Sequence, residues 1–173
     1  LTFASEPDFE TTTSVTATVT VSDGTFTDTQ EVLVTITNVN DNDPVFTSGA
    51  EVSFTADENQ KLIGKLVATD ADGDDLIFTL IGTNDVLVDS ATGVMTFITA
   101  PDFETKASYT FFASVTDAER ASVQEVNIKI NNIVEAPSIK VNEFTIAENN
   151  TFVANLELVD PDNGAFEITF SIS

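Results

Sequence analysis

Apolar and polar residues alternate with a period of two in several short segments, which are rich in valine, isoleucine, threonine and phenylalanine. Five segments show the pattern most clearly: residues 15–21, 32–36, 109–115, 126–130 and 166–172. A period of two places apolar side chains on one face of a β-strand and polar side chains on the other. Three turn sequences separate such segments: Ser22-Asp23-Gly24, Asp72-Gly73-Asp74 and Ala91-Thr92-Gly93. Since no segment has a convincing helical period, the pattern predicts an all-β protein.

Three short motifs recur along the chain at a spacing of about 90 residues. Pro7-Asp8-Phe9-Glu10 returns as Pro101-Asp102-Phe103-Glu104. Asp57-Glu58-Asn59 returns as Ala147-Glu148-Asn149, and Asp70-Ala71-Asp72 returns as Asp160-Pro161-Asp162. A repeat of this length, made of short strands and turns, is typical of a β-sandwich.

The repeat divides the chain into three predicted parts. Residues 44–136 form one complete repeat, residues 1–43 match its later half, and residues 137–173 match its earlier half. We therefore predict tandem Greek-key β-sandwiches of an immunoglobulin-like kind, with one complete and two partial repeats. Two explanations of the partial repeats stay open: the chain is a section of a longer array, or neighbouring molecules complete its two ends.

The chain is strongly acidic, with 29 Asp and Glu residues against 6 Lys and Arg residues and a formal net charge of −23. Such a surface repels nucleic acid and anionic membranes and attracts cations. No apolar run approaches the roughly 18–20 residues that cross a bilayer. We therefore expect neither nucleic-acid binding nor membrane insertion.

Cysteine and histidine are both absent, which excludes a disulfide framework, a thiolate metal site and the commonest general base. The carboxylate pair Asp8 and Glu10 suggests glycosidase-like catalysis, as does its repeat at Asp102 and Glu104. However, the sequence gives no sign of a pocket, and the pair recurs with the repeat. We therefore expect a protein that is not an enzyme.

The motifs resemble those of the cadherin superfamily. Residues 38–46 (Asn-Val-Asn-Asp-Asn-Asp-Pro-Val-Phe) resemble its interdomain linker, and Glu58 resembles its first-strand glutamate. Asp70-Ala71-Asp72 resembles its Asp-x-Asp loop. The Pro-Asp-Phe-Glu copies resemble its Leu-Asp-Arg-Glu motif, and Asp23 and Asp117 resemble the aspartate of its Ala-x-Asp motif. The short loop of residues 70–76 looks more like the cadherin-like repeats of bacterial surface adhesins.

The resemblance implies calcium sites where consecutive repeats meet. Calcium takes six to eight oxygen ligands from carboxylates, amide carbonyls and backbone carbonyls, and the linker of residues 40–42 offers all three kinds. The implied ligands of the first junction are Asp8, Glu10, Asn40, Asp41, Asn42, Asp70, Asp72 and Asp117. Asp74 and Asp75 are either turn formers or auxiliary ligands. Asn38 stands where the family has an aspartate, which is expected to weaken this junction slightly.

The second junction has a poorer linker, residues 131–137, whose only carboxylate is Glu135. Its implied ligands are Glu58, Asp102, Glu104, Glu135, Asp160 and Asp162. We predict fewer or weaker ions there, and more bending. Glu148 and Asp23 would serve further junctions beyond the two ends, so neither is expected to complete a site within this chain.

These features predict a calcium-rigidified structural or adhesion module, an extender segment of a surface or secreted adhesin, at an extracellular or cell-surface location. Its expected partners are neighbouring repeats in the same or an adjacent chain, with a homotypic or host-surface ligand as a further candidate. Two alternatives stay open. One is a subunit of an extracellular filament or sheath joined by complementary half-domains, and the other is a carbohydrate-binding module.

Overall fold

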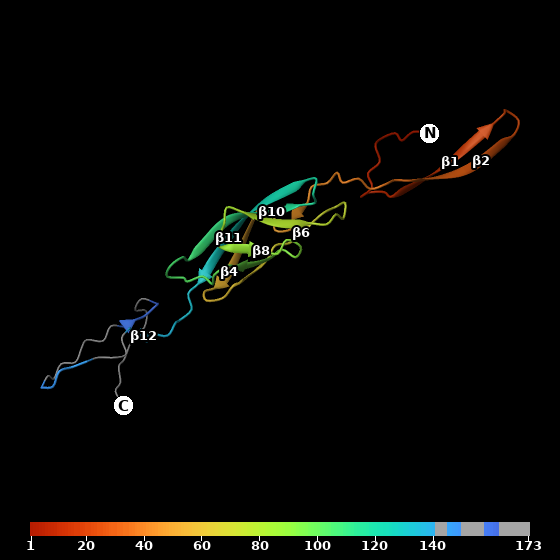
Figure 1. The fold of residues 1–173 in the computed structure, drawn as a ribbon. Coiled ribbons are helices and arrows are strands. Elements are labelled where there is room, and N and C mark those ends of the chain that lie inside the picture. The colour runs from red at the N-terminus through yellow and green to blue at the C-terminus, as the bar shows by residue number, and fades with distance from the viewer. Residues whose placement is uncertain (141–144, 150–157, 163–173) are drawn as a thin grey trace.

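The computed structural model describes residues 1–140, 145–149 and 158–162. Within these ranges the regular elements are strands and none is a helix, so no described helix is long and apolar enough to cross a membrane. Figure 1 shows a hairpin at the N-terminal end, a central body, and β12 towards the C-terminal end. The strands are β1 (Ser14–Ser22), β2 (Thr27–Thr35), β3 (Val45–Phe46), β4 (Glu51–Asp57), β5 (Leu62–Lys65), β6 (Ala68–Thr69), β7 (Ile77–Ile81), β8 (Val86–Val88), β9 (Val94–Phe97), β10 (Ser108–Thr116), β11 (Ala121–Asn131), β12 (Ser138–Ile139) and β13 (Leu158–Val159).

Two layers of strands form the central body, from β3 to β11. One layer is a four-stranded sheet in the order β4-β11-β10-β7, in which β11 runs parallel to β4 and antiparallel to β10. The other layer consists of the sheet β5-β9-β8 and the short pair β3-β6. The expected all-β sandwich is confirmed. The division into one complete and two partial repeats stays a prediction.

The core lies between the two layers and follows the alternation in the sequence. On β10, Phe111, Ala113 and Val115 are buried, whereas the intervening Phe112 is exposed. β11 alternates in the same way, because each buried β10 residue has its cross-strand partner on the same face. The strands of the facing layer contribute five buried residues to this core: Phe46, Ile63, Val86, Met95 and Phe97.

The N-terminal hairpin pairs β1 with β2 in a continuous antiparallel register, as the alternation predicted. The side chains on its apolar face nevertheless remain accessible, with 39% of Val15, 43% of Val19 and 65% of Val21 exposed. The physical reason is that no second sheet packs on this hairpin within the described residues. Its apolar pattern therefore predicted the strands correctly but not their burial.

The C-terminal part contains the two-residue pair β12-β13, which is antiparallel. The strand predicted from the alternation of residues 166–172 lies outside the described residues.

Strand pairing places the acidic loops at opposite ends of the central body. At one end, Ile77 of β7 pairs with Thr116 of β10, so the loop of residues 70–75 lies beside the β10–β11 turn. At the other end, Asp57 of β4 pairs with Asn131 of β11, so Glu58 lies beside the linker that follows β11. The first end is the predicted first junction, and the second end is the predicted second junction.

Candidate metal centre

Carboxylates from separate segments gather at the first junction. Glu10, Asp41 and Asp72 each offer one oxygen, and these oxygens lie within 4.8 Å of one another. Asp70, Asp72 and Asp74 form a second group by the same measure, and Asp72 belongs to both. Four of the predicted residues thus come together, and Asp74 joins them.

Hydrogen bonds from the linker hold the Asp72 side chain in place. Its Oδ2 accepts from the backbone N–H of Asn42 at 2.9 Å and of Asp41 at 3.2 Å. Its Oδ1 accepts from Nδ2 of Asn42 at 3.2 Å, and its backbone carbonyl accepts from Nδ2 of Asn38 at 2.8 Å. The linker therefore wraps the loop of residues 70–75 through its own donors. Asn38 contributes an amide donor here, a role that the sequence did not predict.

Three oxygens at this junction are buried and receive no hydrogen bond from the described residues: Oδ1 of Asn40, Oδ2 of Asp70 and Oδ2 of Asp117. Asp117 is only 7% exposed, and its other oxygen accepts from the backbone N–H groups of Glu119 and Arg120. Buried polar atoms nearly always have partners. Oxygen acceptors with no donor are the ligands that a hard cation such as Ca²⁺ requires.

The electrostatics of the first junction are those of crowded anions. Loss of solvent, together with the charges of Asp70, Asp72 and Asp117, raises the pKa of Asp74. The N–H of Glu10 tends to lower its own pKa, but loss of solvent and the neighbouring Asp72 raise it overall. A divalent cation would relieve this repulsion.

Hydrogen bonds lower the pKa of two other aspartates at this junction, Asp117 and Asp72. The N–H of Arg120 holds the pKa of Asp117 below its usual value, with further contributions from Glu119 and from the adjacent Asn40 side chain. At Asp72, loss of solvent alone would raise the pKa. The backbone and side-chain N–H groups of Asn42 outweigh it, so the pKa of Asp72 is also lowered. Both side chains are therefore kept as carboxylates, the form that binds a cation.

The predicted ligand Asp8 lies in a local turn. Its Oδ1 accepts from the N–H of Thr11 at 3.2 Å and its Oδ2 from the Thr11 hydroxyl at 2.9 Å, which lowers its pKa. Asp102 makes the same two bonds to Thr105. The repeated motif thus forms the same turn twice. At the first junction, however, Asp8 is in neither of the close carboxylate groups.

At the second junction, Glu58 is the best-buried carboxylate of the described residues, at 2% exposed. Its Oε2 accepts from the N–H of Phe103 at 2.8 Å, and its Oε1 accepts from the N–H of Ile133 at 2.7 Å. One side chain therefore ties the end of β4 both to the repeated turn and to the linker.

The other predicted ligands of the second junction surround Glu58. Oxygens of Glu58, Asp102 and Glu104 lie within 4.8 Å of one another. Loss of solvent and the charges of Glu58, Asp162 and Asp102 raise the pKa of Glu104. Asp162 is 7% exposed; its Oδ2 accepts from the N–H of Glu135 at 2.7 Å, and its Oδ1 has no donor among the described residues. Asp160 is half-buried on the same loop.

Two asparagine side chains donate hydrogen bonds to acids of the second junction. Nδ2 of Asn132 donates to Oε1 of Glu104 at 2.7 Å, and Nδ2 of Asn59 donates to Oε1 of Glu135 at 2.6 Å. Sequence reasoning missed both amides, although Asn59 belongs to a recurring motif. The linker residues Ile133 and Val134 carry no side-chain oxygen and remain 44% and 63% exposed.

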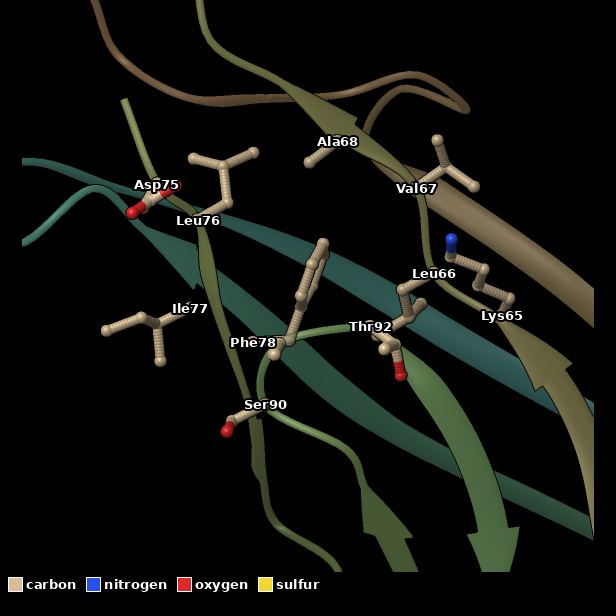
Figure 2. A pocket seen from close by; sticks show the side chains of 11 residues that line it. Lys65, Leu66, Val67, Ala68, Asp75, Leu76, Ile77, Phe78, Ser90 and Thr92 are labelled. Atoms are coloured by element: carbon tan, nitrogen blue, oxygen red, sulfur yellow. The ribbon is translucent and has the colours of Figure 1, made fainter. Parts of the chain in front are cut away.

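A groove of about 630 Å³ lies on the side of the central body and not among the acidic loops. Figure 2 shows its mainly apolar lining, with Leu66, Leu76 and Phe78 around the space and Asp75 at one edge beside Leu76. It contains no cluster of the polar groups that catalysis would require among the residues that line it. Asp75 therefore lies on the wall of a groove, whereas Asp74 lies among the acids of the first junction.

No family model matches the chain. Protocadherin-11 X-linked from Sus scrofa is 31% identical over 148 residues, a match that covers 82% of this chain and 13% of that protein. Protocadherin Fat 1 from Homo sapiens is 29% identical over 157 residues, a match that covers 82% of this chain and 3% of that protein. The chain therefore spans only a small part of these relatives.

Among solved structures, extracellular cadherin domains 1–4 of protocadherin gamma B7 match with a TM-score of 0.67 at 20% identity, over 90% of this chain and 42% of that one. The sandwich of this chain is thus the cadherin-domain fold. The matched proteins are cadherins and not enzymes, so the expectations of a protein other than an enzyme and of an extracellular or cell-surface location are confirmed. Similarity in sequence to protocadherins and in fold to their extracellular domains supports assignment of this chain to the cadherin superfamily.

Proposed function

We propose that this chain is a calcium-rigidified segment of an extracellular adhesin, in which Ca²⁺ joins consecutive cadherin-like sandwiches. Asn40, Asp70 and Asp117 carry the proposal, because their buried oxygens come from three separate segments and have no donor among the described residues. Glu10, Asp41 and Asp72 extend the same site towards residues 1–43. A cation bound among these oxygens would connect the linker to the segments on either side of it, and so restrain their relative motion.

The partners that fit this function are neighbouring repeats in the same or an adjacent chain. The matched structures contain several cadherin domains in series, which supports this view. A homotypic contact or a host-surface ligand is a further partner for the complete protein. The short loop of residues 70–76 favours a repeat of the bacterial adhesin kind. That origin stays a prediction, because the relatives from Sus scrofa and Homo sapiens are mammalian proteins.

Calcium removal tests the function directly. Extracellular calcium modules bind with a Kd of ~0.1–1 mM, and each tenfold excess of free ion over Kd stabilises the bound state by about 1.4 kcal/mol. We expect EDTA to lower the melting temperature of the chain and to widen the distribution of interdomain angles in small-angle scattering. Magnesium at the same concentration is the control, because its strict octahedral geometry suits a smaller ligand set. Identical melting and scattering with calcium and with EDTA would rule the function out.

The two junctions are expected to differ in calcium content. Ile133 and Val134 occupy the second linker where Asn40 and Asp41 occupy the first, so the second junction has fewer oxygen ligands. Its retained acids, Glu58, Glu104 and Asp162 among them, still favour a cation. We therefore propose fewer or weaker ions at the second junction, and a larger bending amplitude there.

Assembly through complementary half-domains is the second candidate. The apolar face of the β1–β2 hairpin favours it, since a hollow of about 300 Å³ lined by Phe3, Val15, Ala17 and Val34 opens on this face. Residues 137–173 of a second molecule carry the motifs of the missing half-repeat. Light scattering after size-exclusion chromatography decides this case, because a monomer that persists at all concentrations excludes such assembly.

A carbohydrate-binding module has less support. The only tyrosine, Tyr109, packs against Phe97 with ring centroids 5.0 Å apart, and Nζ of Lys106 lies 4.0 Å from the centre of the same ring. Its faces are therefore already in contact with protein groups. A sugar needs a free aromatic face, so glycan binding by the calcium-loaded chain would be unexpected.

A further inference from the structure

The loop between β6 and β7 contains one carboxylate more than the resemblance to cadherins assigns. Asp70 and Asp72 match the family motif, whereas Asp74 does not. Yet an oxygen of Asp74 lies within 4.8 Å of oxygens of both. The three acids alternate with Ala71 and Gly73 along the loop.

The loop backbone explains this placement. The N–H of Asp72 donates to Oδ1 of Asp70 at 2.9 Å, which closes a tight turn. Gly73 has a φ of +80°, a conformation that glycine adopts at no steric cost. The loop bends at Ala71 and Asp72, and an oxygen of Asp74 comes close to oxygens of both Asp70 and Asp72.

A second observation indicates that this group faces a ligand. Asp117, on the neighbouring β10–β11 turn, is more than nine-tenths buried, and its Oδ2 has no donor among the described residues. Oδ2 of Asp70 is buried in the same way. The loop of residues 70–75 lies beside the β10–β11 turn that carries Asp117, because Ile77 pairs with Thr116. Two oxygens without a donor among the described residues, one on Asp70 and one on Asp117, therefore lie at the end of the central body that carries the three acids.

We propose that Asp74 is a calcium ligand in its own right, completing with Asp70, Asp72 and Asp117 a four-carboxylate site on the rim of the central body. This inference rests on the proposed function and adds a residue to it. Four carboxylates around one ion favour a multivalent cation with a large coordination shell, which Ca²⁺ has and Mg²⁺ lacks. Since all four belong to residues 70–117, this ion would bind to the central body even where contacts from Glu10 are absent.

The chain offers a matched control for Asp74. Asp75 carries the same charge one position later, but it lies at the edge of the groove on the side of the body (Figure 2). The variants Asp74→Asn and Asp75→Asn therefore remove the same charge from the same loop. Only the first removes a negative charge and one of two carboxylate oxygens from the acid group.

Calorimetric titration of the full chain with CaCl₂ tests the proposal. Asp74→Asn is expected to weaken one class of sites by roughly tenfold or more, since losing even an outer-shell partner of a metal costs ~10–100-fold in affinity. Asp75→Asn is expected to leave all site affinities within about twofold, because an exposed charge outside the site is screened by salt.

The effect of Asp74→Asn on the melting temperature distinguishes a calcium ligand from a structural residue, because for a ligand its sign depends on whether calcium is present. Without calcium, Asp74→Asn relieves repulsion and is expected to raise the melting temperature; with calcium, it reduces the stabilisation that the ion gives. Equal calcium affinities for Asp74→Asn and Asp75→Asn, with the wild type still binding, would overturn this inference alone. A wild-type chain that binds no calcium would overturn the proposed function as well.

Discussion

Replacing Glu58 with alanine removes the carboxylate that joins three parts of the second junction. We expect this variant to destabilise the central body even without calcium, because both oxygens of Glu58 accept backbone N–H groups, from Phe103 and from Ile133. A hydrogen bond to a charged group contributes about 1.5–3 kcal/mol to stability. Loss of the hydrogen bond from Phe103 should cost most of that free energy. Loss of the bond from Ile133 should cost less, because Ile133 is 44% exposed and water can replace its partner.

Relief of repulsion from Asp102 and Glu104 subtracts from this loss, so the net effect expected is about 2–4 kcal/mol. For a unit of this size, that corresponds to a fall in melting temperature of roughly 10–25 °C. Glu58→Gln keeps one acceptor but turns an NH₂ group towards the other donor, and is expected to cause about half the loss.

Urea denaturation in EDTA, followed by tyrosine fluorescence, measures the stability of the central body. Tyr109 is the only tyrosine, the chain has no tryptophan, and Tyr109 packs on the core of the central body. The control is Glu51→Ala at the exposed start of the same strand, where a change within about 0.5 kcal/mol is expected. If Glu58→Ala and Glu51→Ala have the same unfolding midpoint, the two hydrogen bonds of Glu58 do not stabilise the central body.

Two further predictions concern the linkers and a turn. Ile133→Asn combined with Val134→Asp gives the second linker the side chains of Asn40 and Asp41, and native mass spectrometry in calcium should then detect at least one more ion per chain. An unchanged ion count would mean that these positions do not set the difference between the junctions. Gly93→Ala should destabilise the central body by at least ~1 kcal/mol more than Gly82→Ala in urea denaturation. Both glycines have a positive φ, but only a Cβ at Gly93 meets a backbone atom, the carbonyl oxygen of Leu66 at 2.5 Å, whereas the space at Gly82 is open. Equal losses of stability in the two variants would show that the Leu66 backbone shifts to make room for the added Cβ.

Much of the fold could be predicted because strand alternation and turn glycines are local signals. Residues 109–115 and 126–130 became β10 and β11, and the glycine of each predicted turn has a positive φ. The acid motifs also come together as the resemblance to cadherins implied, since Asp70 and Asp72 share a group and Glu58 lies with Asp102 and Glu104. The long-range part of the prediction therefore came from the family motifs and not from the local pattern.

Other features depend on geometry that no local pattern contains. Asp74 and Asp75 are identical neighbours in sequence, yet Asp74 lies in the acid group and Asp75 lies on the groove wall. The double acceptor role of Glu58 requires β4 to end beside both Phe103 and Ile133. Similarly, the exposure of Val19 and Val21 depends on what lies opposite the hairpin, which its own residues cannot specify.

The parallel pairing of β4 with β11 determines how the central body would carry tension. The chain enters the central body through the two-residue strand β3, continues into β4 and leaves after β11. β4 and β11 are in register from Glu51 with Glu125 to Asp57 with Asn131. Pulling on the two connections would slide these strands along each other instead of peeling them apart. Under such shear the hydrogen bonds between β4 and β11 share the load, whereas peeling would break them one after another.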